Sequence, residues 1–116
     1  MSGEGIFQSI MTTLRGRVIL GGSFTTANTS APTSPKGDGT VARTGTGVFT
    51  VTLPKKYKTC ESLIPIIDNA ANSGVTVSAA YSSTTGVITV TVIVSAAAAD
   101  TTGRTVNWFM VATGRT

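Results

Sequence analysis

Few side chains in this chain are suited to acid–base, nucleophilic or metal chemistry. Its 116 residues include no histidine, which is the commonest general base and the commonest metal ligand in proteins. Cys60 is the single cysteine, and with no histidine to activate it we expect a buried small hydrophobic residue. The five carboxylates are spread one to a segment: Glu4, Asp38, Glu61, Asp68 and Asp100. We therefore predict no catalytic residue, no metal site and no cofactor, and a protein that is not an enzyme.

The densest charge is the sequence KKYK at residues 55–58, directly after Pro54. Three lysines around Tyr57 could contact a phosphate or a sugar, with the tyrosine ring as a stacking surface. A short basic cluster at the end of a strand also keeps a sheet edge soluble. The nine lysine and arginine residues are otherwise scattered, and the net charge is only +4. We therefore favour an exposed corner and disfavour nucleic-acid binding.

The elements that must position these residues are predicted to be strands. The chain is 41% hydrophobic, only 12% charged and rich in Thr, Ser and Gly, a composition that favours strands and turns. Residues 48–53 alternate, so that Phe49, Val51 and Leu53 share one face, and residues 75–81 and 87–95 alternate in the same way. We predict an all-β fold, an antiparallel β-sandwich or jelly-roll-like barrel of about seven or eight short strands. This domain spans residues 17–116.

Three stretches of the domain are less regular. Residues 25–39 contain two prolines and two glycines and are predicted to form a long ordered loop. Pro65, inside a predicted strand at residues 63–68, indicates a sheet edge or a bulge. Asp100 lies in a turn sequence, AAAADTTG. We expect it to cap that turn and to pair with Arg104 in its own hairpin.

Residues 1–16 are predicted to form an N-terminal arm outside the domain. Within residues 6–14 the apolar side chains form one stripe at helical spacing, and Gly16 lies where a helix would end. Nine residues are too few for a stable isolated helix, and a first strand or an irregular arm is the alternative. We expect the arm to bind a partner protein or a neighbouring subunit through Ile6, Phe7, Ile10, Met11, Leu14, Arg15 and Arg17.

The last predicted strand, residues 105–113, is apolar on both faces. A single small core needs only one of them, so the surplus indicates burial between subunits. We therefore predict a homo-oligomer, with an interface that includes Trp108, Phe109, Met110 and Val111.

Three segments resemble a group of small virion proteins of tailed bacteriophages: RGRVILGGSFTT at 15–26, VARTGTGVFTVTL at 41–53, and AAAADTTGRTVNWFMVA at 96–112. In those proteins a strand with a glycine-rich end is followed by a hairpin like the second segment, and a hairpin like the third closes the domain. The resemblance implies a capsid decoration protein that binds and stabilises the shell of major capsid protein. It also implies a small β-rich oligomer, a trimer, at symmetric positions on that shell.

Two other functions compete with decoration of the capsid. One is the tip of a tail or head fibre that recognises a host surface glycan, although one Trp, two Tyr and four Phe are few aromatic residues for a glycan site. The other is a nucleic-acid-binding module that uses Lys55, Lys56 and Lys58. Glu4 near the start argues against a signal peptide, and no 18 apolar residues run together to span a membrane. We therefore expect synthesis in the host cytoplasm and a final location in the virion.

Overall fold

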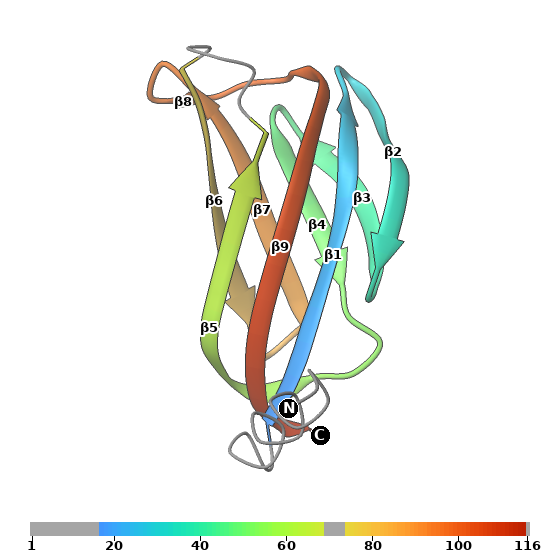
Figure 1. Cartoon of the computed structure of the whole chain (residues 1–116), viewed down its shortest axis with the longest axis vertical. Coiled ribbons are helices and arrows are strands. Elements are labelled where there is room, and N and C mark those ends of the chain that lie inside the picture. The colour runs from blue at the N-terminus through green and yellow to red at the C-terminus, as the bar shows by residue number, and fades with distance from the viewer. Residues whose placement is uncertain (1–16, 69–73, 116) are drawn as a thin grey trace, which may run out of the picture.

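The computed structural model describes residues 17–68 and 74–115, and these form two antiparallel β-sheets packed face to face (Figure 1). The predicted all-β sandwich is confirmed, with nine strands in the described ranges where seven or eight were expected. The strands are β1 (Arg17–Ala27), β2 (Ser30–Gly37), β3 (Thr40–Gly45), β4 (Val48–Thr52), β5 (Tyr57–Ile67), β6 (Val75–Ser82), β7 (Val87–Val94), β8 (Ala97–Ala98) and β9 (Thr102–Arg115). The predicted arm, with Ile6, Phe7, Ile10, Met11, Leu14 and Arg15, lies outside the described residues.

The last strand, β9, holds the first sheet together. That sheet has the order β2-β1-β9-β5, and the second has the order β3-β4-β7-β6, with β8 added on β7. Since β9 lies between β1 and β5, the first and last strands of the domain are hydrogen-bonded neighbours. Strand β1 begins where β9 ends, with Arg17 opposite Thr113 (Figure 1). This arrangement brings segments far apart in the sequence onto one rigid sheet.

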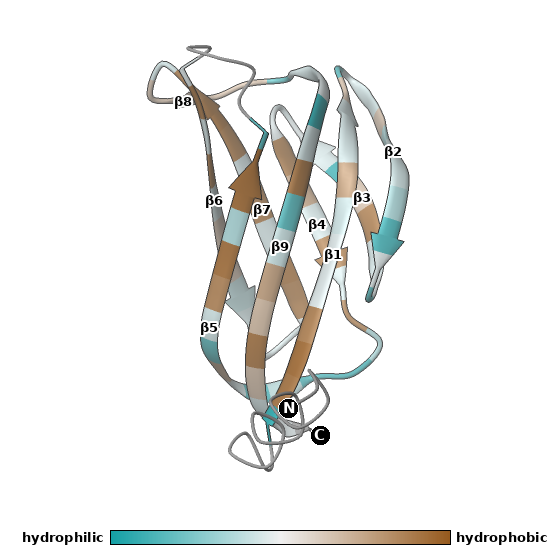
Figure 2. Ribbon diagram, in the orientation of Figure 1, coloured by the Kyte–Doolittle hydropathy of each residue, from teal (hydrophilic) through white to brown (hydrophobic). Residues whose placement is uncertain are grey.

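Alternation along the strands builds the core between the two sheets. Phe49, Val51 and Leu53 all point inward, as the sequence predicts. Phe24 of β1 meets Phe49 of β4 across the sandwich, with ring centroids 5.0 Å apart. The largest fully buried side chains are Trp108, Phe24, Phe49, Ile88 and Met110. Figure 2 shows hydrophobic stretches interrupted by more polar ones along β4, β7 and β9.

The predicted long loop over residues 25–39 is wrong, because β1 continues to Ala27 and β2 occupies most of the remainder. Both prolines of that stretch lie in β2, an edge strand. Proline is tolerated there because its missing N–H is not needed for pairing. The sheet edge predicted from Pro65 is confirmed, because Pro65 lies in β5 at the opposite edge of the same sheet.

Candidate functional site

Within the two described ranges no pocket is present, and no three His, Cys, Asp or Glu side chains are grouped so as to hold a metal ion. No helix of that part of the chain is long and apolar enough to cross a membrane. The charged and apolar features of the described residues are ion pairs, the basic corner at residues 55–58 and the exposed outer face of the first sheet.

Asp100 pairs with Arg43 of β3, so the predicted pair with Arg104 is wrong. The Arg43 guanidinium donates from Nη2 to Oδ2 at 2.9 Å, and from Nη2 and Nε to Oδ1 at 3.0 and 3.1 Å. The backbone N–H of Gly47 donates to the same Oδ1 at 2.9 Å. These donors, Arg43 first, lower the pKa of Asp100 below its ordinary value. The carboxylate is thus fully used in holding two segments together.

The segment that Asp100 holds is the turn between β3 and β4. Gly47 in this turn has φ +65, and a Cβ there would lie 2.5 Å from the carbonyl oxygen of Ala99. The carbonyl of Gly47 also accepts a hydrogen bond from the backbone N–H of Val92 at 2.8 Å. Residues 41–53 and 96–112 therefore meet in the fold through this contact, whose role is structural.

The other described carboxylates are also engaged. Asp38 accepts a hydrogen bond from the backbone N–H of Gly21 at 3.0 Å, and Asp68 accepts one from that of Thr105 at 2.9 Å. Glu61 forms an ion pair with Arg17 on the surface. Each of these carboxylates links one strand or loop to another.

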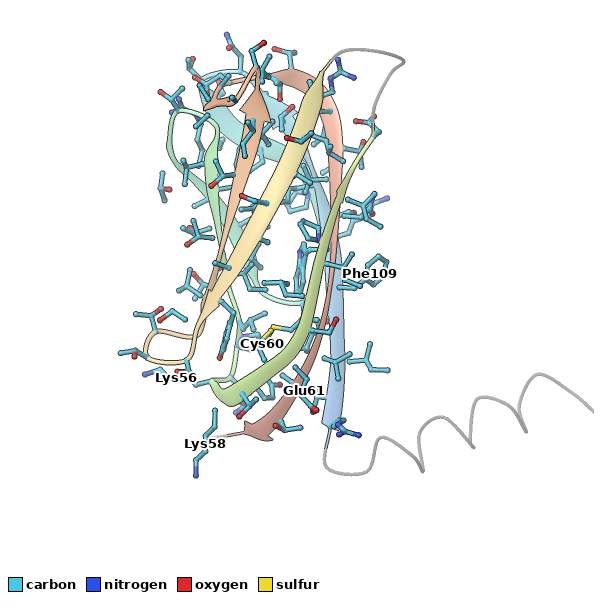
Figure 3. The ribbon with its side chains drawn as sticks, turned by 90° about the vertical axis from the view of Figure 1, so that its left-hand side faces the viewer. Lys56, Lys58, Cys60, Glu61 and Phe109 are labelled. Atoms are coloured by element: carbon cyan, nitrogen blue, oxygen red, sulfur yellow. The ribbon has the colours of Figure 1, made fainter. Side chains whose placement is uncertain are left out.

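The KKYK cluster forms the exposed corner that was predicted. Lys55, Lys56 and Lys58 are exposed, whereas Tyr57 is buried, and Figure 3 shows Lys56 and Lys58 at one end of the sandwich. The backbone N–H of Tyr57 donates to Oη of Tyr81 at 2.8 Å, and that hydroxyl donates to the carbonyl of Tyr57 at 3.1 Å. The tyrosine of the cluster is therefore an anchor in the core and presents no ring for stacking.

Cys60 is half-buried rather than fully buried, and it packs against the core. Its thiol donates weakly to the carbonyl of Ser62 at 3.5 Å. Burial raises the pKa of the thiol above its ordinary value, which keeps it protonated and poorly nucleophilic at neutral pH. This agrees with the small hydrophobic role expected from the sequence.

The outer face of the first sheet carries a cluster of exposed large hydrophobic side chains, which we call the outer apolar patch. Its members are about half exposed: Ile19 51%, Ile64 52%, Ile66 49% and Phe109 50%. They come from β1, β5 and β9, three neighbouring strands (Figure 1). Figure 3 shows Phe109 projecting from this sheet on the side away from the core.

Strand register places the patch residues in three successive rows of the sheet. Phe109 lies between Gly21 on β1 and Ile64 on β5, and these three positions form one row across the sheet. A Cβ on Gly21 would lie 3.5 Å from Cδ1 of Phe109, so the ring leans over this glycine. The row below joins Ile19 to Val111, and the row above contains Ile66. The two outer rows also contain polar residues, Ser62 in the first and Ser23 and Asn107 in the second, so the apolar side chains run diagonally from Ile19 through Phe109 and Ile64 to Ile66.

The predicted oligomer interface divides between the two faces of β9. Trp108 and Met110 have no exposed surface, because both point into the chain's own core, so their assignment to an interface is wrong. Phe109 and Val111 point outward, and their role in an interface stays a prediction. Sequence reasoning did not single out Ile64 and Ile66. The sequence carries the same indication of an interface for them, because residues 63–67 are apolar on both faces, as residues 105–113 are.

Comparison of the chain with protein-family models, with curated proteins and with solved structures gave no match.

Proposed function

We propose that this chain is a structural protein of a tailed-bacteriophage particle, a capsid decoration protein that binds the shell of major capsid protein through the outer apolar patch. The observation that carries the proposal is the patch itself, four half-exposed large side chains on a rigid sheet. Contiguous exposed apolar surface of this kind marks protein-binding sites. The resemblance of three sequence segments to small phage virion proteins supplies the identity of the partner.

Phe109 is the anchor of the proposed contact. It stands at the centre of the patch, and its ring rests over Gly21, where no side chain competes for space. Aromatic residues at the centre of an interface supply most of the binding free energy, while their neighbours mainly exclude water. Ile19, Ile64 and Ile66 surround Phe109 in this way, and the ion pair of Arg17 with Glu61 provides a polar border.

The free energy available from one patch is modest. Burying the remaining half of each large side chain contributes roughly 1 kcal/mol per residue, before the costs of association. A single copy would therefore bind weakly. Three copies linked around a symmetric position of the shell would bind far more tightly, because the second and third contacts form at high effective concentration. This is the physical reason to propose that the protein acts as a trimer on the shell.

The number of copies per particle tests this function. Particles of the virus that encodes the chain should contain hundreds of copies, measured by quantitative mass spectrometry against the major capsid protein. A few dozen copies or fewer would contradict decoration and indicate a fibre or tail component. Retention of hundreds of copies on DNA-free shells, at both low and high salt, would separate binding to the shell from binding to packaged DNA.

A further inference from the structure

Among the edge strands of the two described sheets, β6 lacks the features that keep an edge from pairing with another chain. Prolines, charged side chains and bulges are the usual protection. Strand β2 has two prolines and Lys36, and β5 has Pro65 and Lys58. Strand β3 has Arg43, and the pairing of all three strands contains a register shift. Strand β6 has no proline and no charged residue, and its eight residues pair with β7 without a shift.

The hydrogen bonds of β7 show which backbone groups of β6 are free. The N–H and C=O of Val92 in β7 bond to Gly47 and Ala99, on the side away from β6. These groups alternate sides along a strand, so the N–H and C=O of Thr91 face β6 and its partner Ser78. The residues of β6 on either side of Ser78 then direct their backbone groups outward. Four residues do so, and no other described strand pairs with them: Val75, Val77, Ala79 and Tyr81.

The core is also incompletely covered along this side of the sandwich. Strands β5 and β6 adjoin here as edges of their two sheets, and Figure 3 views the molecule from this side, with β6 in yellow. Apolar side chains of both strands pack against the core but are only partly buried: Leu63, Ile67, Val77 and Ala79. A strand added along β6 would therefore form backbone hydrogen bonds and cover apolar surface at the same time.

We propose that β6 pairs with β6 of a second copy of the chain, antiparallel and related by a twofold axis. A twofold contact requires a surface that is complementary to itself. Pairing centred on Ser78 sets Val77 of one copy opposite Ala79 of the other. It sets Val75 opposite Tyr81 in the same way, so the outward N–H and C=O groups of the two edges all bond to one another.

The side chains and the length of the edge fit a second copy. On the outer face Ser78 meets Ser78 of the second copy, and Thr76 meets Ala80. None of these side chains is charged, so no like charges lie opposite each other. The eight residues of β6 extend about 27 Å, at about 3.4 Å per residue. Four pairs with two bonds each give about eight hydrogen bonds, close to the roughly ten of a typical stable interface.

The pairing itself does not rest on the proposed function, but one consequence for docking does. Residues opposite each other in an antiparallel pair point to the same face of the sheet. The two copies therefore stack their first sheets on the same side, and both outer apolar patches face in one direction. A pair of copies then offers two contacts to the shell at once, which strengthens binding through effective concentration. Both patches stay uncovered, so threefold contacts on the shell remain compatible with the pairing.

A charge exchange at the centre of the pairing tests it in the full-length chain. Ser78 is exposed in the single copy, and Ser78→Lys or Ser78→Glu would set two like charges opposite each other. At micromolar concentration the wild type should sediment at twice the monomer mass of 11.8 kDa. Each variant should dimerise at least about tenfold more weakly. An equimolar mixture of the two should restore the dimer, because a lysine then faces a glutamate.

The matched control is Thr89→Lys, which adds the same charge at an exposed position of β7, away from the edge of the same sheet. It should dimerise as the wild type does. Hydrogen exchange provides a second readout. The amides of Val77 and Ala79 should exchange slowly in the wild-type dimer and rapidly in Ser78→Lys. The amide of Ala80, which faces β7, should stay protected in both, which shows that the variant is folded.

Three results would overturn the pairing: a wild type that stays monomeric, single variants that keep the dimer, or a mixture that fails to restore it. Rapid exchange of Val77 and Ala79 in a wild-type dimer would also overturn it, because the contact would then lie elsewhere. None of these measurements involves the shell, so failure of the pairing and failure of the proposed function are distinguishable.

Discussion

Trp108 is fully buried in the core and packs against the backbone of Gly22, which has no side chain. A Cβ on Gly22 would lie 3.0 Å from Nε1 of Trp108 and 2.5 Å from the carbonyl oxygen of Lys36. The indole N–H is buried and donates to no partner among the described residues. The β1 backbone therefore approaches Trp108 closely to pack against it. Position 22 has no room for a residue larger than glycine.

We predict that Gly22→Ala lowers the free energy of unfolding by about 1–3 kcal/mol, the usual cost of overpacking a core. Gly45→Ala is the matched control, because a Cβ at this strand position would meet its nearest atom only at 4.0 Å. It should change stability by no more than about 0.5 kcal/mol. Urea denaturation of both variants measures the difference, and equal stabilities would contradict the packing described for Trp108.

The Arg43–Asp100 pair predicts a specific pH dependence of stability. The folded-state pKa of Asp100 is lowered, so the pair's stabilisation is complete above the unfolded-state pKa of about 3.9. It is lost as the pH falls through the lower folded-state value, since the unfolded chain then binds the proton more readily. In Asp100→Asn the fall in unfolding free energy below about pH 4 should be shallower than in the wild type.

A pair of arginine variants checks the corrected partner of Asp100. Arg43→Ala should lower the melting temperature at pH 7, because it removes three hydrogen bonds to the carboxylate. Arg104→Ala removes the partner that the sequence suggested and should leave the melting temperature nearly unchanged. The reverse order of the two effects would contradict the pairing.

At the scale of residues, the sequence predicted which side chains face the core but not which polar groups meet. Alternation determines the inward face of a strand, so Phe49, Val51 and Leu53 were placed correctly. Arg43 and Asp100 are 57 positions apart, and only the pairing of strands brings them together. No local sequence pattern predicts which strands pair. Proximity in the sequence therefore favoured Arg104 as the partner of Asp100.

At the scale of elements, one tyrosine hydroxyl ties β5 of the first sheet to β6 of the second. Oη of Tyr81 accepts from the N–H of Tyr57 and donates to its carbonyl. Tyr81→Phe removes both hydrogen bonds and should destabilise the domain by about 1–2 kcal/mol. Hydrogen exchange at residues 57–60 should accelerate in this variant. An unaltered melting temperature and unaltered exchange would show that this edge is held by packing alone.

The basic corner at the start of β5 is expected to contribute little to stability. Lys55, Lys56 and Lys58 are exposed, so replacing all three with serine should change stability by no more than about 1 kcal/mol. Binding to the shell should also persist, because the corner lies outside the outer apolar patch. Loss of particle binding in the triple variant would identify the cluster as a docking site and contradict the assignment.

The sequence was informative about the existence of strands and less so about their extent. Period-two alternation identified the strands around residues 48–53, 75–81 and 87–95, and all three are present. The prolines of residues 25–39 predict a loop, and no local pattern shows that β1 continues through Gly21 and Gly22 to Ala27. In the fold these glycines make room for Phe109 and Trp108, and the prolines occupy an edge. Both roles depend on the neighbouring strand, which a single segment does not reveal.

At the scale of the whole molecule, the fold separates the two apolar faces that the sequence showed on the last strand. One face of β9 completes the core with Trp108 and Met110, and the other contributes Phe109 to the outer apolar patch. The surplus of apolar residues that predicted an interface is thus concentrated on one outer face of one sheet.

The most direct test of the docking surface is binding of purified protein to shells that lack it, measured by co-sedimentation. Phe109→Ser should reduce binding at least about tenfold, which corresponds to a loss of about 1.4 kcal/mol of binding free energy. Ala80→Ser, at an exposed position of β6 on the other sheet, is the control and should bind as the wild type does. Melting temperatures of both variants verify that the domain is folded. Wild-type binding by folded Phe109→Ser would contradict the account, because the patch would then not be the surface that meets the shell.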